Sequence, residues 1–217
     1  MRYYKFPKWL KPIFPGAIWD FSFLPKPKSK EDGSEQSVIY LTFDDGPHPE
    51  TTPWLIELLK TYNAKATHFC LGKNVERYPD LYAQLIKEGH QVGNHTQDHL
   101  KGLKSSTKTY VENVELASQV VSSRLFRPPY GKMKPKQFYK LKKKSYQTVF
   151  WSHITYDFDC ELSAEKRKSK TLKSVKHGSI VVFHDSIKAF PQLQKELPEL
   201  LSFWLTQGYV FKVIPVN

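Results

Sequence analysis

Residues 38–47 read V-I-Y-L-T-F-D-D-G-P, an apolar run rich in β-branched and aromatic residues followed by two adjacent acids and a Gly-Pro turn. The apolar run predicts a strand, and the Gly-Pro pair predicts the turn that ends it. From Val38 onward, similar short runs alternate with longer segments at helical spacing, which is typical of repeated βα units. The stretch therefore indicates the first strand of an α/β fold, with two carboxylates at its end.

The same alternation predicts the remaining elements. Strands are expected at 38–43, 66–71, 90–94, 124–127, 146–151, 179–183 and 209–213. Helices are expected near 51–62, 79–88, 108–123, 135–144, 163–175 and 192–206. Seven strands followed by helices predict a distorted, incomplete (β/α) barrel with about seven parallel strands. An open parallel sheet is the alternative.

Size and composition agree with one catalytic domain. The chain of 217 residues can bury the core of such a fold, and a hydrophobic content of 40% excludes a disordered protein. The formal net charge of +12 favours an anionic partner such as nucleic acid, an anionic glycan or an anionic lipid. Cys70 and Cys160 match no metal or redox pattern, and we expect both to be free thiols in the core.

The first 37 residues differ in character from the rest. We interpret 1–37 as a basic, aromatic N-terminal extension and linker, and 38–217 as the catalytic domain. Pro7, Pro12 and Pro15 interrupt every apolar run, so we expect no signal peptide. No run is long enough for a transmembrane helix, which leaves a cytoplasmic or membrane-peripheral location.

Charge and aromatic rings are concentrated at the start of this extension. Residues 1–30 hold seven basic residues and one acid, a net charge of +6. The basic residues are Arg2, Lys5, Lys8, Lys11, Lys26, Lys28 and Lys30, and the aromatic ones are Tyr3, Tyr4, Phe6, Trp9, Phe14, Trp19, Phe21 and Phe23. Such a segment suits a tether to an anionic membrane surface or acidic polymer. It equally suits a cap whose rings pack against the barrel and cover its open side.

Two segments indicate a metal site. Asp44 and Asp45 are adjacent at the end of a strand, where two carboxylates are unfavourable unless a cation or a proton relieves them. Residues 93–99 read G-N-H-T-Q-D-H, and the spacing of His95 and His99 suits two imidazoles on one divalent ion. Each segment alone also has a non-functional explanation: an ordinary acidic turn for the first, and a chance pair of histidines for the second. Together they predict a site with two histidines and one aspartate.

Three further segments carry candidate catalytic groups. Residues 127–131 read R-P-P-Y-G, a rigid turn that can aim a backbone N–H at an oxyanion while Arg127 pairs with a carboxylate. Residues 180–185 read I-V-V-F-H-D, and His184 ends the apolar run of this segment. It is either a proton donor or a core histidine with its hydrogen bonds satisfied. Asp157 follows another strand and could raise the pKa of such a histidine. All these candidates fall at the carboxyl ends of different predicted strands, the edge where active sites of parallel α/β folds assemble.

Taken together, these segments resemble the polysaccharide deacetylases of carbohydrate esterase family 4, also called the NodB homology domain. The resemblance runs from about Val38 to about Phe211 in the family's motif order. T-F-D-D-G-P and R-P-P-Y-G stand in full, and G-N-H-T-Q-D-H fits the pattern H-[ST]-x-x-[HD] in register.

The resemblance implies a role for each matched residue. Asp44 would be the general base, oriented by Arg127. His184 would be the general acid, tuned by Asp157. The metal ligands would be Asp45, His95 and His99.

The resemblance also implies the contacts around the reacting group. The Tyr130 backbone N–H would face the oxyanion, and Pro129, Phe158 and Val182 would border the substrate. In the family's fourth motif, D-x-x-D-W, Ile154 replaces the first Asp and Phe158 the Trp. In the fifth motif, Val182 replaces a Leu. These differences concern the acyl pocket and the choice of substrate.

The implied activity is metal-dependent hydrolysis of acetyl groups on an N-acetylated glycan, such as peptidoglycan or a chitin oligosaccharide, with release of acetate. Zinc is the expected metal, with cobalt, nickel or manganese as alternatives. A glycan-binding module with weak or no catalysis, or an O-acetyl esterase, is the alternative function. We expect an acetylated glycan as the partner of a monomer. No nucleic-acid partner is expected, because no recognisable binding module follows Val38.

Overall fold

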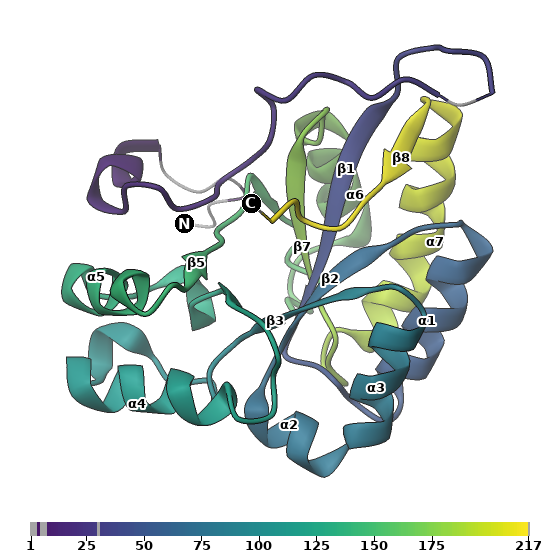
Figure 1. The fold of residues 1–217 in the computed structure, drawn as a ribbon. Coiled ribbons are helices and arrows are strands. Elements are labelled where there is room, and N and C mark those ends of the chain that lie inside the picture. The colour runs from purple at the N-terminus through teal and green to yellow at the C-terminus, as the bar shows by residue number, and fades with distance from the viewer. Residues whose placement is uncertain (1–3, 5–7, 30, 217) are drawn as a thin grey trace.

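The computed structural model describes residue 4, residues 8–29 and residues 31–216 (Figure 1). Parallel strands form one curled sheet in the order β5-β4-β3-β2-β1-β7-β6, and β8 pairs with β1 outside this path. The strands are β1 (Ser37–Asp44), β2 (Ala66–Cys70), β3 (Gln91–Asn94), β4 (Leu125–Phe126), β5 (Gln147–Thr148), β6 (His153–Ile154), β7 (Ser179–His184) and β8 (Tyr209–Phe211). The expected distorted, incomplete barrel is confirmed.

Helices follow most of the strands. They are α1 (Thr51–Thr61), α2 (Gly72–Arg77), α3 (Pro79–Lys87), α4 (Thr107–Ala117), α5 (Pro135–Lys143), α6 (Ala164–Ser174) and α7 (Phe190–Thr206). Short 3-10 helices lie at Lys8–Ile13, Gly102–Lys104 and Pro129–Gly131. Two elements, β6 and α2, were not predicted from the sequence. No helix in the described part of the chain has both the length and the apolar character needed to cross a membrane.

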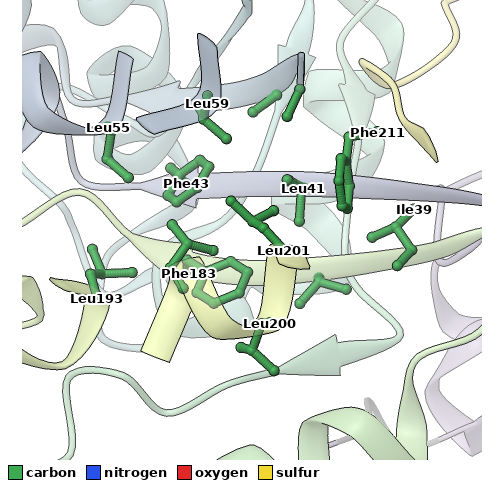
Figure 2. Packing of buried hydrophobic residues seen from close by; sticks show 14 of the residues in the cluster. Ile39, Leu41, Phe43, Leu55, Leu59, Phe183, Leu193, Leu200, Leu201 and Phe211 are labelled. Atoms are coloured by element: carbon green, nitrogen blue, oxygen red, sulfur yellow. The ribbon is translucent and has the colours of Figure 1, made fainter. Parts of the chain in front are cut away.

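β1 shows how the side-chain alternation of a strand builds the two faces of the sheet. Its odd-numbered residues Ile39, Leu41 and Phe43 point outward and pack with Leu55 of α1 and Leu201 of α7 (Figure 2). Val38 and Tyr40, two of its even-numbered residues, pack with the apolar residues of the barrel interior. Asp44, the last even-numbered residue, therefore lies on the interior side, at the carboxyl end of the barrel.

The N-terminal segment bonds to both edges of the open barrel. The Ile18 N–H donates to the carbonyl of Thr148 in β5, and the Tyr4 carbonyl accepts from the N–H of Ile154 in β6. Phe21 is buried and packs against Tyr40 of the barrel interior, with ring centroids 4.8 Å apart. These contacts favour the packed cap among the two interpretations of this segment.

Several residues named for this segment lie outside the described residues: Arg2, Tyr3, Lys5, Phe6, Pro7 and Lys30.

The two cysteines differ in their exposure to solvent. Cys70 is a buried free thiol as expected, whereas Cys160 is exposed, so the expectation of a core thiol is wrong there. It lies in the loop between β6 and α6, outside the packed core.

Candidate metal centre and active site

The candidate residues converge at the carboxyl edge of the sheet. Asp44 ends β1 and His184 ends β7, and the two residues are paired in the register of these parallel strands. Asp45 follows directly after β1, and His95 follows directly after β3. Neighbouring parallel strands thus bring together groups that are far apart in the sequence.

Asp45, His95 and His99 form the group that could hold a metal ion. Each offers one donor atom, and these atoms all lie within 4.8 Å of one another. The Asp45 Oδ1 lies 3.6 Å from His95 Nε2 and 3.2 Å from His99 Nε2. Two histidines and a carboxylate are a donor set typical of zinc and related divalent ions.

Protonation in this cluster leaves lone pairs facing one another. His95 Nδ1 lies 2.7 Å from the Arg127 carbonyl, which can only accept, so Nδ1 carries the proton and Nε2 turns its lone pair to the cluster. Burial and the neighbouring His95 outweigh the opposing effect of Asp45 and Asp44 and lower the pKa of His99 to about 4, so its ring is neutral. Asp45 Oδ1 is buried without a hydrogen-bond partner among the described residues. Facing lone pairs and an unpaired buried oxygen fit a bound cation.

Asp44 is held by a buried arginine. Arg127 is fully buried and donates from Nη1 to Asp44 Oδ1 at 2.8 Å and to Thr42 Oγ1 at 2.7 Å. The guanidinium lies 4.1 Å from the centre of the Phe69 ring. Burial raises the pKa of Asp44, but the charge and hydrogen bond of Arg127, together with the nearby His95 and His184, outweigh burial and lower the pKa overall. Asp44 is therefore an ionised carboxylate that can accept a proton.

His184 is paired with a buried carboxylate. Its Nδ1–H donates to Asp157 Oδ1 at 2.8 Å, and its backbone N–H donates to Asp157 Oδ2 at 2.7 Å. Burial lowers the pKa of His184. The charges of Asp157 and of the more distant Asp45 and Asp44 outweigh this effect and raise the pKa to about 9. The ring is therefore protonated at neutral pH, with Nε2–H as the donor that Asp157 does not engage.

The predicted substrate contacts divide into surface and interior residues. Tyr130 is 51% exposed, and its ring packs against His99 with centroids 4.6 Å apart. Phe158 packs edge-on against His184 at 4.7 Å. Pro129 is buried in the turn beside Tyr130, and Val182 is fully buried inside the barrel, two residues before His184.

Left-handed backbone conformations gather at this site. Among the described residues other than glycine, seven have positive φ, and five of them lie within one residue of a candidate named above. The five are Asp45 (φ 80°), Thr96 (φ 70°), His99 (φ 58°), Tyr130 (φ 60°) and Tyr156 (φ 61°). Such conformations are unfavourable for L-residues and cluster at functional sites.

Sequence reasoning missed residues that support the site. Asn74 of α2 donates from Nδ2 to the Asp45 carbonyl at 2.7 Å. Asp185 is buried and accepts hydrogen bonds from the hydroxyls of Thr51 and Thr52 at the start of α1. Its carboxylate packs so closely on Gly46 that any side chain there would collide with it. The only available signal was the position of Asp185 directly after His184.

Comparison with known proteins gives a consistent result. The polysaccharide deacetylase family model matches residues 31–149. A peptidoglycan-N-acetylglucosamine deacetylase of Bacillus cereus is 37% identical over 188 residues, which cover 83% of this chain and 88% of that protein. A chitooligosaccharide deacetylase of Azorhizobium caulinodans is 34% identical over 158 residues, which cover 69% of this chain and 74% of that protein. The crystal structure of the Bc1960 peptidoglycan N-acetylglucosamine deacetylase has a TM-score of 0.77 at 26% identity and covers 92% of this chain and 91% of that chain.

Proposed function

The chain belongs to the polysaccharide deacetylase family, and we propose that it removes acetyl groups from the N-acetylglucosamine units of peptidoglycan. As a member of this family it is a metal-dependent hydrolase that deacetylates N-acetylated glycans. The choice of peptidoglycan is supported by the relative that is 37% identical, which is named for this substrate. The observation that carries the assignment is the cluster of three metal-donor atoms beside two buried pairs of opposite charge.

Asp45, His95 and His99 would hold the divalent ion, which we propose to be zinc, with cobalt, nickel or manganese as alternatives. A bound ion supplies a Lewis acid that polarises the acetyl carbonyl and lowers the pKa of a water molecule. The hydrogen bond from His95 Nδ1 to the Arg127 carbonyl fixes the orientation of that ring. The metal cluster is thus coupled to the arginine that holds Asp44.

Asp44 acts as the general base in this proposal. It accepts the proton of the attacking water, and Arg127 holds the carboxylate in place through the 2.8 Å hydrogen bond. Because the pKa of Asp44 is lowered, the carboxylate is ionised and ready to accept at neutral pH.

His184 acts as the general acid. It donates its Nε2 proton to the departing amine, so that acetate and the free glucosamine unit separate. Asp157 holds the ring through Nδ1 and keeps it protonated until that step. The Tyr130 backbone N–H, in the turn after Pro129, would stabilise the oxyanion. Phe158 and Val182 would shape the space beside the acetyl group.

Acetate release from a small panel of glycans tests the function. The panel holds peptidoglycan fragments, chitotetraose and an O-acetylated glycan, each assayed with and without a chelator.

Asp44→Asn should keep its metal and lose activity about a hundredfold or more, as loss of a general base does. His99→Ala should lose metal in elemental analysis, and exposed Asp80→Asn is the matched control. Chelator-resistant acetate release or full activity of Asp44→Asn would overturn the proposal.

We also propose that the protein acts as a monomer, with an extension at 1–37 in front of a catalytic domain at 38–217. The family match begins at residue 31, so most of the proposed extension lies outside the match. The basic charge of the extension suits an anionic polymer or membrane surface. Salt-sensitive binding to anionic vesicles and the mass in solution test these two proposals.

A further inference from the structure

Two lysines lie over the two aromatic rings that border the candidate site. Lys101 Nζ is 5.3 Å from the centre of the Tyr130 ring, and Lys188 Nζ is 5.8 Å from the centre of the Phe158 ring. The Tyr130 ring packs against His99, and the Phe158 ring packs against His184. One aromatic ring therefore connects Lys101 to a proposed metal ligand, and another connects Lys188 to the proposed acid.

Both ammonium groups are available to a ligand. Lys101 and Lys188 are exposed, and neither Nζ has a carboxylate or hydrogen-bond partner within the described part of the chain. The nearest carboxylates in sequence are engaged elsewhere: Asp98 accepts from Asn113 Nδ2 at 2.7 Å, and Asp185 accepts from threonine hydroxyls. An anion that binds at these positions meets no competing internal partner.

Contact with an aromatic face restricts a lysine that would otherwise move freely. A cation over an exposed ring gains about 0.5–1 kcal/mol, which holds the ammonium near the ring and leaves its other side to solvent. In the described part of the chain only one other lysine, Lys11, lies over a ring, and that ring belongs to the N-terminal segment. The arrangement is therefore not a general property of the many surface lysines.

We propose that Lys101 and Lys188 are anion-binding subsites that select a glycan with carboxylates on the sugars adjacent to the reacting N-acetylglucosamine. The inference rests on the proposed deacetylase function and specifies its substrate class. In peptidoglycan the adjacent sugars are N-acetylmuramic acid, whose lactyl group ends in a free carboxylate where no peptide is attached to it. Chitin, a neutral polymer of N-acetylglucosamine, offers the same reacting group without the flanking charge.

The test compares two tetrasaccharides that differ in this charge. One alternates N-acetylglucosamine with N-acetylmuramic acid and carries no peptide, and the other is chitotetraose. We expect the wild-type protein to have the higher kcat/KM on the carboxylated substrate, with the difference shrinking as salt concentration rises. Lys101→Met and Lys188→Met should each lower the ratio of kcat/KM on the carboxylated substrate to kcat/KM on chitotetraose about three- to fivefold, mainly through KM. A loss of this size corresponds to the usual free energy of an exposed ion pair.

Matched variants separate local from general charge effects. Lys101→Arg and Lys188→Arg should keep most of the preference, because the charge and the ring contact remain. Lys140→Met and Lys143→Met on α5 remove the same net charge away from the site and should leave the ratio unchanged. A ratio that is the same in wild type and both methionine variants would overturn the inference, as would an equal loss in the α5 controls. Absence of acetate release from both tetrasaccharides would instead reject the deacetylase function itself.

Discussion

Asp45 and His99, two of the proposed metal ligands, have φ angles of 80° and 58°, which side chains other than glycine rarely adopt. Each such conformation costs on the order of 1–3 kcal/mol, so neighbouring contacts must hold it. At Asp45 the backbone N–H donates to the Phe69 carbonyl, and the carbonyl accepts from Asn74. The strain is therefore located where three donor atoms have to converge, and the hydrogen bonds around it maintain that geometry.

Asp157→Asn is expected to lower the pKa of His184, because a neutral amide replaces the carboxylate that accepts its Nδ1 proton. The wild-type ring, with its pKa raised to about 9, keeps its proton through neutral pH and loses it only at higher pH. The limb of the rate profile that falls at high pH should therefore move to lower pH by about 1–3 units, the usual effect of one nearby opposite charge. Measurement of kcat from pH 5 to pH 10, with Asp80→Asn as control, checks this.

A limb that stays in place would contradict the proposed role of Asp157.

The pair of His184 and Asp157 should also affect the free energy of unfolding. The folded state binds the His184 proton more tightly than the unfolded chain, so the pair stabilises the protein fully below the unfolded pKa of 6.5. That contribution is lost as the pH rises through the folded-state value.

The candidate site could be predicted where chemistry follows local sequence. Adjacent acids, two histidines four residues apart and a histidine at a strand end are visible in short segments. Asn74 was not predicted, because its contact with the Asp45 carbonyl depends on the path of α2 after β2. No spacing rule in the sequence reports that path.

At the scale of elements, β3 shows how a small residue keeps the site in place. Gly93 lies in β3, and a Cβ added there would come within 2.6 Å of the Phe69 ring of the adjacent strand β2. That ring lies under the Arg127 guanidinium, which in turn holds Asp44. The absence of a side chain at Gly93 therefore gives Phe69 the room to support the arginine.

Gly93→Ala is expected to destabilise the protein and to reduce activity more than the loss of stability explains. Overpacking a core position costs about 1–3 kcal/mol, and the displaced ring should shift Arg127 relative to Asp44. Urea unfolding and kcat at a temperature where the variant is folded measure the two effects. Phe69→Leu in the same chain should recover part of the stability by making room. A single variant as stable and active as wild type would contradict this explanation.

The elements themselves were predictable to different degrees. β1 and α7 are long enough to show their periodicity, and both were predicted within a few residues of their observed ends. β6 has two residues and α2 has six, too few to show an alternation or a helical face. Both exist because neighbouring segments supply their contacts, as when the β6 residue Ile154 pairs with Val182 of β7.

At the scale of the whole molecule, the N-terminal segment is part of the packed structure. Phe14, Trp19 and Phe21 are buried, and Trp19 stacks on Phe150 with centroids 4.3 Å apart. Hydrogen bonds join the segment to β5 and β6, the two edge strands. Covering these edges protects backbone groups that an incomplete barrel would otherwise expose.

Trp19→Ala is expected to lower the melting temperature markedly. Truncation of a buried tryptophan costs about 3–5 kcal/mol, which for a protein of this size corresponds to roughly 6–20 °C. Phe23, in the same segment but 76% exposed, provides the control, and Phe23→Ala should change the melting temperature little. Calorimetry at pH 7 measures both. Equal melting temperatures for the two variants would show that the segment does not stabilise the barrel.

The divided pairing of β1 has a consequence for the order in which the chain can fold during synthesis. Leu41–Asp44 pair with β2, which the ribosome produces soon afterwards, but Ser37–Ile39 pair with β8 on the same side of the strand. Ser37 and its partner Tyr209 are 172 positions apart. The first half of β1 therefore keeps an unpaired edge until nearly the whole described chain has been translated. Pairing between segments so distant in sequence favours slow folding, and until β8 is made this edge of the nascent chain can associate with other strands.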